Sequence, residues 1–236
     1  MVDKQFFADR ADALEGLRTT TGLAIFDLDR TLLAGSSLIA LGRALAGSGV
    51  VPRRHLATGA LRDARFRRRG VADRDVASLK TTALHMVAGR QAEPLAALAR
   101  EVGAELAASL RPAARFLVDQ HLRAGDFCVV LSASPQELVE AVALGLGVHR
   151  AIGTVGAVAD GRYTGAVEGA FCYGPGKLER LREVLGELDL STAFAYADSA
   201  SDLPLLSICG HPVAVSPDRR LRAVAIERGW PILSLS

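Results

Sequence analysis

Residues 23–33 read LAIFDLDRTLL, an apolar run that ends at Asp27 and is followed at once by a second aspartate, Asp29. A run that is apolar at every position is typical of a parallel strand buried on both faces of a sheet. Two similar runs, FCVVLS at 127–132 and AFAYAD at 193–198, also end in a small polar or acidic residue. Because the carboxyl ends of parallel strands meet at one edge of an open sheet, these polar residues are expected to converge there.

Segments with the periodicity of helices follow or separate the three predicted strands. Helices are predicted over residues 112–124, 135–146, 176–188, 202–208 and 218–228. The segment AVADGRYTG places Asp160 and Gly161 between two β-prone stretches, which predicts a hairpin. The alternation of strands and helices predicts an α/β fold with a doubly wound, Rossmann-like parallel sheet.

A long insertion, residues 36–110, lies between the first two strands. It is rich in Ala, Leu and Arg, has helical periodicity and contains no buried strand. Because it is too long for a loop, it predicts an α-helical cap inserted into a core made of residues 1–35 and 111–236. A further amphipathic helix is expected at 5–18. The insertion contains a cluster of five arginines: Arg62, Arg65, Arg67, Arg68 and Arg69. This cluster forms either a solvated basic face or a recognition surface for an anionic leaving group.

The composition excludes several classes of protein. The 236 residues carry 28 basic and 26 acidic side chains, a formal charge of +2, which gives no reason to expect bulk binding of nucleic acid. The sequence shows neither an apolar run of the roughly 18 residues that a membrane span needs nor a secretory signal, so a cytoplasmic location is expected. The three cysteines do not form a zinc motif and are expected to be reduced and buried. The sequence does not define an oligomeric state.

Asp27 and Asp29 flank Leu28 at the end of the first strand. Two neighbouring carboxylates repel each other unless a cation or a shared proton compensates, and Mg²⁺ suits such a pair because it takes few carboxylates together with waters and phosphate oxygens. The alternative is a pair that caps a turn. In LSASP, Ser132 is a candidate to bind phosphate oxygens before a helix, although serine at that place is usually a cap.

Two later motifs favour the chemical interpretation. Lys177 opens a helix after the turn GPG, where it can neutralise a phosphate or remain solvated. Asp198 and Asp202 follow the third strand, four residues apart. Acids at a helix start favour the helix dipole, but a second acidic position is also what a magnesium site needs.

These motifs, D-x-D-x-T, a serine after a strand, a lysine and D-x-x-x-D, resemble in their order those of the haloacid dehalogenase superfamily, in its phosphoserine-phosphatase-like branch (subfamily IB). Outside the insertion, the resemblance extends from Leu23 to about Leu233. It implies a Mg²⁺-dependent phosphomonoester hydrolase that acts on a small phosphorylated metabolite through an aspartyl-phosphate on Asp27. Asp29 would protonate the leaving alcohol and then take a proton from water.

The resemblance also implies how phosphate and metal are held. Thr31 would support the turn, while Ser132 and the backbone N–H of Ala133 would bind phosphate oxygens. Lys177 would offset the charge of Asp27 and of the phosphoryl group. The implied metal ligands are Asp27, the carbonyl of Asp29, Asp198 and, close by or through water, Asp202.

Three residues depart from the pattern of this branch. Arg30 stands where many relatives have Gly or Ser, and its side chain is expected in solvent. Ser201 takes a place often held by Asn. Ser36 occupies the position at which phosphoserine phosphatases usually have a Glu that reaches the ammonium group of the substrate, so phosphoserine is expected to be a poor substrate.

Two alternatives remain open, a phosphoserine phosphatase proper and a phosphoreceiver module. A phosphoreceiver also uses acids at strand ends, a Ser or Thr, a Lys and Mg²⁺. Its phosphorylated Asp, however, normally follows a later strand, where this chain has Ser132, and the large insertion would have no role. A P-loop ATPase is excluded because GPGKL lacks the G-x-x-x-x-G-K-[ST] arrangement.

Overall fold

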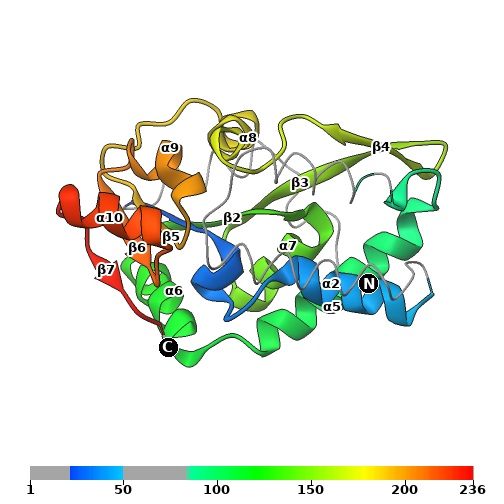
Figure 1. Ribbon diagram of the computed structural model, residues 1–236, viewed down its shortest axis with the longest axis horizontal. Coiled ribbons are helices and arrows are strands. Elements are labelled where there is room, and N and C mark those ends of the chain that lie inside the picture. The colour runs from blue at the N-terminus through cyan, green and yellow to red at the C-terminus, as the bar shows by residue number, and fades with distance from the viewer. Residues whose placement is uncertain (1–21, 50–83, 85, 236) are drawn as a thin grey trace.

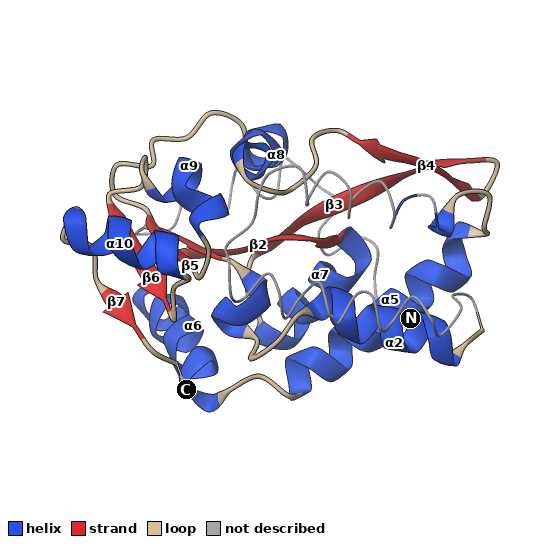
Figure 2. Ribbon diagram, viewed as in Figure 1, coloured by secondary structure: helices blue, strands red, loops and turns tan. Residues whose placement is uncertain are grey.

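The computed structural model of this chain describes residues 22–49, 84 and 86–235. A seven-stranded sheet runs through them in the order β4-β3-β2-β1-β5-β6-β7. Its strands are β1 (Leu23–Phe26), β2 (Phe127–Pro135), β3 (Arg150–Ala159), β4 (Arg162–Glu168), β5 (Phe194–Ala197), β6 (His211–Val215) and β7 (Ile232–Leu233). All neighbouring strands are parallel except β3 and β4. Helices lie on both sides of the sheet (Figures 1 and 2), which confirms the predicted doubly wound α/β fold.

The central strand β1 contributes to both hydrophobic cores. Ala24 and Phe26 belong to one core, and Leu23 and Ile25 belong to the other, so side chains alternate between the two faces of the sheet. Phe26 is fully buried and pairs with a residue of β2 on one side and of β5 on the other. The unbroken apolar run in the sequence is therefore explained by burial on both faces.

Two groups of helices cover the sheet. On one side lie α6 (Pro112–Ala124) and α7 (Gln136–Leu146), and on the other lie α8 (Pro175–Leu185), the 3₁₀ turn η2 (Ala200–Asp202), α9 (Leu203–Leu206) and α10 (Arg219–Glu227). The helices predicted from the sequence are confirmed with small differences at their ends. Pro112 opens α6, and Gly125 ends it in the left-handed conformation at φ 82°.

The predicted hairpin is confirmed as β3 and β4, joined through Asp160 and Gly161, which adopt φ of 49° and 71°. The strands β6 and β7 are not predicted from the sequence. Strand β6 contains Pro212, which lacks the backbone N–H that pattern rules expect inside a sheet, and β7 is only two residues long.

The described part of the insertion includes α2 (Ser37–Gly47) and α5 (Ala92–Ala108). Helix α5 packs closely on α7, and glycines allow this approach. A Cβ at Gly103 of α5 would lie 2.5 Å from the carbonyl oxygen of Leu138, and a Cβ at Gly145 of α7 would lie 2.5 Å from Cβ of Ala107. Residues of both α2 and α5 belong to the same hydrophobic core as α7. The division into a cap at 36–110 and a core stays a prediction. The Arg62–Arg69 cluster and the helix expected at 5–18 lie outside the described residues.

All three cysteines are buried and free, as expected from their apolar surroundings in the sequence. Among the described residues, no helix combines the length and the apolar character needed to cross a bilayer.

Candidate active site

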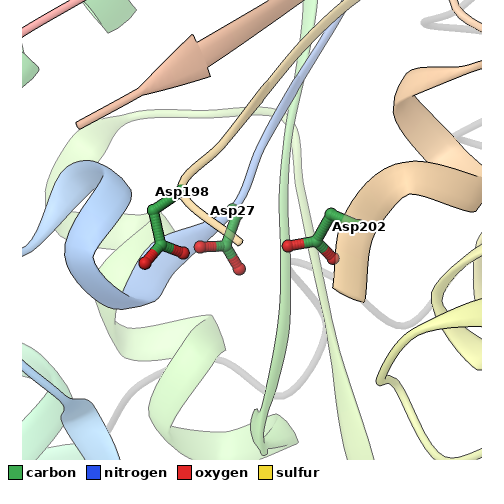
Figure 3. A group of neighbouring side chains, drawn as sticks. All are labelled: Asp27, Asp198 and Asp202. Atoms are coloured by element: carbon green, nitrogen blue, oxygen red, sulfur yellow. The ribbon is translucent and has the colours of Figure 1, made fainter. Parts of the chain in front are cut away.

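Three acidic side chains meet at the carboxyl edge of the sheet. Asp27 follows β1, Asp198 follows β5, and Asp202 ends the 3₁₀ turn η2. One carboxylate oxygen from each of them lies within 4.8 Å of the others, and Figure 3 shows Asp27 between the other two side chains. The expected convergence of polar residues at this edge is thus seen for both aspartate-bearing strands.

The loop after Asp27 holds its carboxylate. Residues Leu28–Leu32 form one wide helical turn, in which the N–H of Leu33 donates to the carbonyl of Leu28 at 2.9 Å. Thr31 Oγ1 donates to Asp27 Oδ2, also at 2.9 Å. The threonine predicted to support this turn therefore contacts the candidate nucleophile itself.

Lys177 lies in the first turn of α8 and is only 3% exposed. Its ammonium donates to Asp27 Oδ1 at 2.7 Å and forms an ion pair with Asp202 Oδ1 at 2.8 Å, at an angle unsuited to a hydrogen bond. Burial alone would lower the pKa of Lys177, but the charges of Asp202 and Asp27 outweigh burial and raise that pKa above its usual value. The alternative of a solvated lysine is wrong.

Gly176 explains how α8 can begin so close to the loop that precedes it. A Cβ at this position would lie 2.1 Å from the carbonyl oxygen of Phe171, so only glycine fits there. Gly174, just before the helix, has φ 57°. The turn GPG therefore sets the path of the chain that brings Lys177 to the acids.

Burial shifts the ionisation of the two later acids. It raises the pKa of Asp198 well above its usual value, and the negative charge of Asp27 adds to this rise. Burial also raises the pKa of Asp202 to about 6, although Lys177 opposes the rise. Carboxylates that share a buried site in this way need a compensating cation or a shared proton.

Arg30 supplies part of that compensation. Its Nε lies 3.3 Å from Asp198 Oδ2, so the expectation that this side chain points to solvent is wrong. Arg30 also adopts φ 63°, the left-handed conformation that favours glycine.

The chemistry of the donor set fits a hard divalent cation. Asp27, Asp198 and Asp202 offer carboxylate oxygens, the ligands that Mg²⁺ takes in proteins. With Asp29, the described part of the site holds more acids than it has cations to pair with them, since Lys177 and Arg30 are the ones that contact the group. The excess of negative charge and the oxygen donors are what a magnesium site requires.

Asp29 is separate from this acidic group and points to the start of α2. The backbone N–H of Ser37 donates to Asp29 Oδ1 at 2.8 Å. Burial raises the pKa of Asp29 to about 6, the hydrogen bonds from Ser37 oppose the rise, and the charge of Asp27 adds to it. A carboxyl group with this pKa can both give and take a proton near neutral pH.

Ser132 lies inside β2 rather than after it, because β2 continues to Pro135 with an irregular register against β3. The predicted end of this strand at Leu131 is therefore wrong. Ser132 Oγ accepts from the N–H of Ser134 at 3.2 Å, and Thr154 Oγ1 donates to the carbonyl of Ala133 at 2.9 Å. These bonds fix the segment that carries the two predicted phosphate-binding residues.

Sequence reasoning missed several residues around the site: Ser37, Arg111, Ser134 and Thr154. The hydroxyl groups of Ser37 and Ser134 form a short hydrogen bond that joins the insertion to β2. Thr154 comes from β3, and the Arg111 Nη2 donates to the carbonyl of Thr31 at 3.1 Å. Of these residues, only Ser37 had a signal in the sequence. The serine pair Ser36 and Ser37 is typical of a helix start, and α2 does begin there.

A parallel sheet that gathers buried carboxylates and a lysine at its carboxyl edge is an arrangement suited to proteins that handle phosphate groups. The sequence comparisons agree with this class. The family model for haloacid dehalogenase-like hydrolases matches residues 24–207, and the chain belongs to this family.

Curated relatives give the family assignment more detail. The chain is 38% identical over 216 residues to a phosphoserine phosphatase of Mycobacterium tuberculosis, covering 90% of this chain and 70% of that protein. It is 36% identical over 219 residues to a histidinol-phosphatase of Neisseria meningitidis, covering 90% of this chain and 98% of that protein. The prediction that this chain is a phosphatase is thereby confirmed.

Solved structures confirm the fold. A protein of unknown function from Bordetella pertussis has a TM-score of 0.77 and 32% identity, covering 92% of this chain and all of that one. A substrate-bound phosphoserine phosphatase has a TM-score of 0.63 and 18% identity, with coverage of 90% and 92%. The two phosphatases among the curated relatives favour an enzyme over the phosphoreceiver alternative.

Proposed function

We propose that this phosphatase hydrolyses a small phosphomonoester with Mg²⁺ and that Asp27 is its covalent nucleophile. The observation that carries the proposal is the environment of the Asp27 carboxylate. Lys177 and Thr31 hold its two oxygens at 2.7 and 2.9 Å, and Asp29 follows two residues later. Held in this way, the carboxylate cannot rotate freely, which reduces the entropy lost in reaching the transition state.

In the first half of the proposed reaction, a carboxylate oxygen of Asp27 forms a bond to phosphorus while the bond from phosphorus to the ester oxygen breaks. Asp29 gives its proton to the departing alkoxide. In the second half, Asp29 takes a proton from a water molecule, whose oxygen attacks phosphorus and releases inorganic phosphate and the free Asp27 carboxylate. The pKa of Asp29, raised to about 6, supports this double role.

The remaining residues are proposed to hold charge. Lys177, the hydroxyl of Ser132 and the N–H of Ala133 would bind phosphate oxygens. A magnesium ion held by Asp27, the carbonyl of Asp29 and Asp198, with Asp202 adjacent, would offset the charge of the phosphoryl oxygens. The acidic group of Figure 3 supports this assignment by its donor chemistry.

The insertion is proposed to choose the substrate as a cap at residues 36–110. The start of α2 supports this proposal, because Ser37 binds Asp29 directly and thus joins the insertion to the reacting groups. Two relatives of nearly equal identity are named for different phosphomonoesters, so the relatives do not indicate a single substrate. A cytoplasmic location and the lack of a nucleic-acid partner stay predictions of the sequence.

Two measurements test the proposal. The first is release of inorganic phosphate from a panel of phosphomonoesters, including phosphoserine and histidinol phosphate, with Mg²⁺ or with excess EDTA. The second is the same assay on Asp27→Asn, in which an amide can neither attack phosphorus nor balance the metal. Turnover by this variant above a few per cent of wild type, after deamidation has been excluded, would rule out the covalent mechanism.

A further inference from the structure

Arg111 lies between α5 and α6, where the insertion returns to the core, and reaches back to the loop that follows Asp27. Its Nη2 lies 3.1 Å from the carbonyl oxygen of Thr31, 3.3 Å from that of Leu33 and 3.4 Å from that of Arg30. One nitrogen of the guanidinium therefore serves three carbonyls of the same loop.

The shape of the loop explains why these carbonyls need an external donor. Asp29 and Arg30 have dihedral angles outside the helical region, so the wide turn cannot use its carbonyls as a regular helix does. Shielded backbone carbonyls are nearly always paired, and an arginine is a donor whose charge strengthens each bond. Arg111 supplies this donor from a residue about 80 positions later in the chain.

We propose that Arg111 is a positioning residue for the reaction, an inference that rests on the proposed function. It holds the carbonyl of Thr31, and the hydroxyl of Thr31 holds Asp27 Oδ2. It also holds the carbonyl of Arg30, the residue after Asp29. Through these two residues, Arg111 fixes the nucleophile and the acid–base group relative to each other.

The geometry favours arginine over lysine at this position. Nη2, which makes all three contacts, belongs to a planar and always charged group of fixed geometry, whereas an ammonium is a point charge on a flexible stem. Arg111 Nε is buried without a hydrogen bond among the described residues. A buried donor without a partner lowers stability, so this arginine is better explained by its contact with the loop than by local stability alone.

Steady-state kinetics of Arg111→Ala test the proposal, with Arg115→Ala as the matched control. Arg115 lies on α6, and its Nη2 also donates to a carbonyl, that of Gly145 at 2.7 Å, but it does not contact the loop after Asp27 in any hydrogen bond of the described residues. We expect Arg111→Ala to lower kcat by roughly tenfold to a hundredfold and to change KM less than about threefold, because a misplaced reacting group mainly affects the chemical step. Arg115→Ala should keep kcat within about twofold, and Arg111→Lys should be intermediate.

Amide hydrogen exchange gives a readout that does not depend on activity. Peptides covering residues 27–35 should exchange faster in Arg111→Ala than in wild type and should not change in Arg115→Ala. Unchanged exchange, an equal loss of kcat in both variants, or a loss confined to KM overturns the proposal. If Arg111→Ala exchanges faster but the wild-type protein releases no phosphate from any substrate of the panel, the proposed function is rejected and the contact between Arg111 and the loop is still established. If the alanine variant does not fold, Arg111→Lys and Arg111→Gln carry the same two measurements.

Discussion

Replacing Lys177 by methionine would remove the cation that two buried carboxylates share. The ammonium lies 2.7 Å from Asp27 Oδ1 and 2.8 Å from Asp202 Oδ1, and the side chain is 3% exposed. Methionine has a similar length and can fill the volume of the lysine stem. The variant therefore removes charge while it keeps most of the packing.

The loss of stability expected for Lys177→Met follows from the burial of the two acids. Removing one partner of a buried ion pair typically costs about 3–5 kcal/mol of unfolding free energy, because a charge is left without compensation. Burial already raises the pKa of Asp202 to about 6 while Lys177 opposes the rise, and without the ammonium this pKa must rise further. We expect a loss of about 3–5 kcal/mol at pH 7.5.

The loss should be smaller at low pH. A carboxyl group whose pKa is raised in the folded state binds more protons there than in the unfolded chain. Its contribution to the free energy of unfolding is therefore favourable below the unfolded pKa and is lost as the pH rises through the folded pKa. At pH 5 the Asp202 of the variant is protonated and no longer needs a cation. One proton is worth at most about 1.4 kcal/mol per pH unit, so the loss should be about 1–3 kcal/mol smaller at pH 5 than at pH 7.5.

Urea unfolding in EDTA at the two pH values measures this difference. The double variant Lys177→Met/Asp202→Asn should recover part of the loss at pH 7.5, because it also removes the charge left unpaired. Arg182→Met is the matched control, since Arg182 is a half-exposed cation on the same helix and pairs only with the exposed Glu187 among the described residues; its effect should stay within about 0.5 kcal/mol. An equal loss for Lys177→Met at both pH values would assign the cost to packing and refute the electrostatic argument.

Further predictions concern the metal and the substrate. Mg²⁺ should raise the melting temperature more at pH 7.5 than at pH 5, because burial raises the pKa of both Asp198 and Asp202 and protons therefore compete with the metal more strongly at the lower pH. Thermal scans with and without Mg²⁺ at the two pH values measure this difference. Asp198→Ala should raise the Mg²⁺ concentration for half-maximal activity more than Asp202→Ala, whose carboxylate is already engaged by the lysine. Ca²⁺ should inhibit, since it readily binds both oxygens of a carboxylate. If Ser36 stands where the resemblance places an ammonium-binding Glu, phosphoserine should trail the best phosphomonoester of a panel in kcat/KM by roughly tenfold to a hundredfold. A tenfold lead for phosphoserine would contradict the inference from Ser36.

The convergence of Asp27 and Asp198 was predictable because it depends on few details. An apolar run implies a strand buried on both faces, such strands are parallel, and parallel strands end at one edge. The rule needs neither the exact length of a strand nor its neighbours. It therefore survives the error at β2, where the strand continues past Leu131 to Pro135.

The order and extent of the outer strands were harder to predict from the sequence. Strand β6 contains Pro212 and β7 has only two residues, so both depend on neighbours that are already in place. Strand β3 changes from buried to exposed toward its end, where it leaves the parallel sheet and pairs with β4 alone. Such segments take their structure from tertiary contacts rather than from local preference.

The positioning groups of the site could not be predicted, for a physical reason that applies to each of them. Arg111, Ser37 and Thr154 contact partners at separations of 80, 8 and 21 residues, and in each contact one of the two groups belongs to the backbone. Every residue carries backbone groups, so no pattern of residue types records which carbonyl an arginine or a threonine will meet. Lys177 differs because its partners are carboxylates, whose charge can be recognised in the sequence. Charged pairs in the sequence therefore indicate the candidate reacting groups but not the groups proposed to position them. Variants such as Arg111→Lys measure how much of the rate depends on these proposed positioning groups.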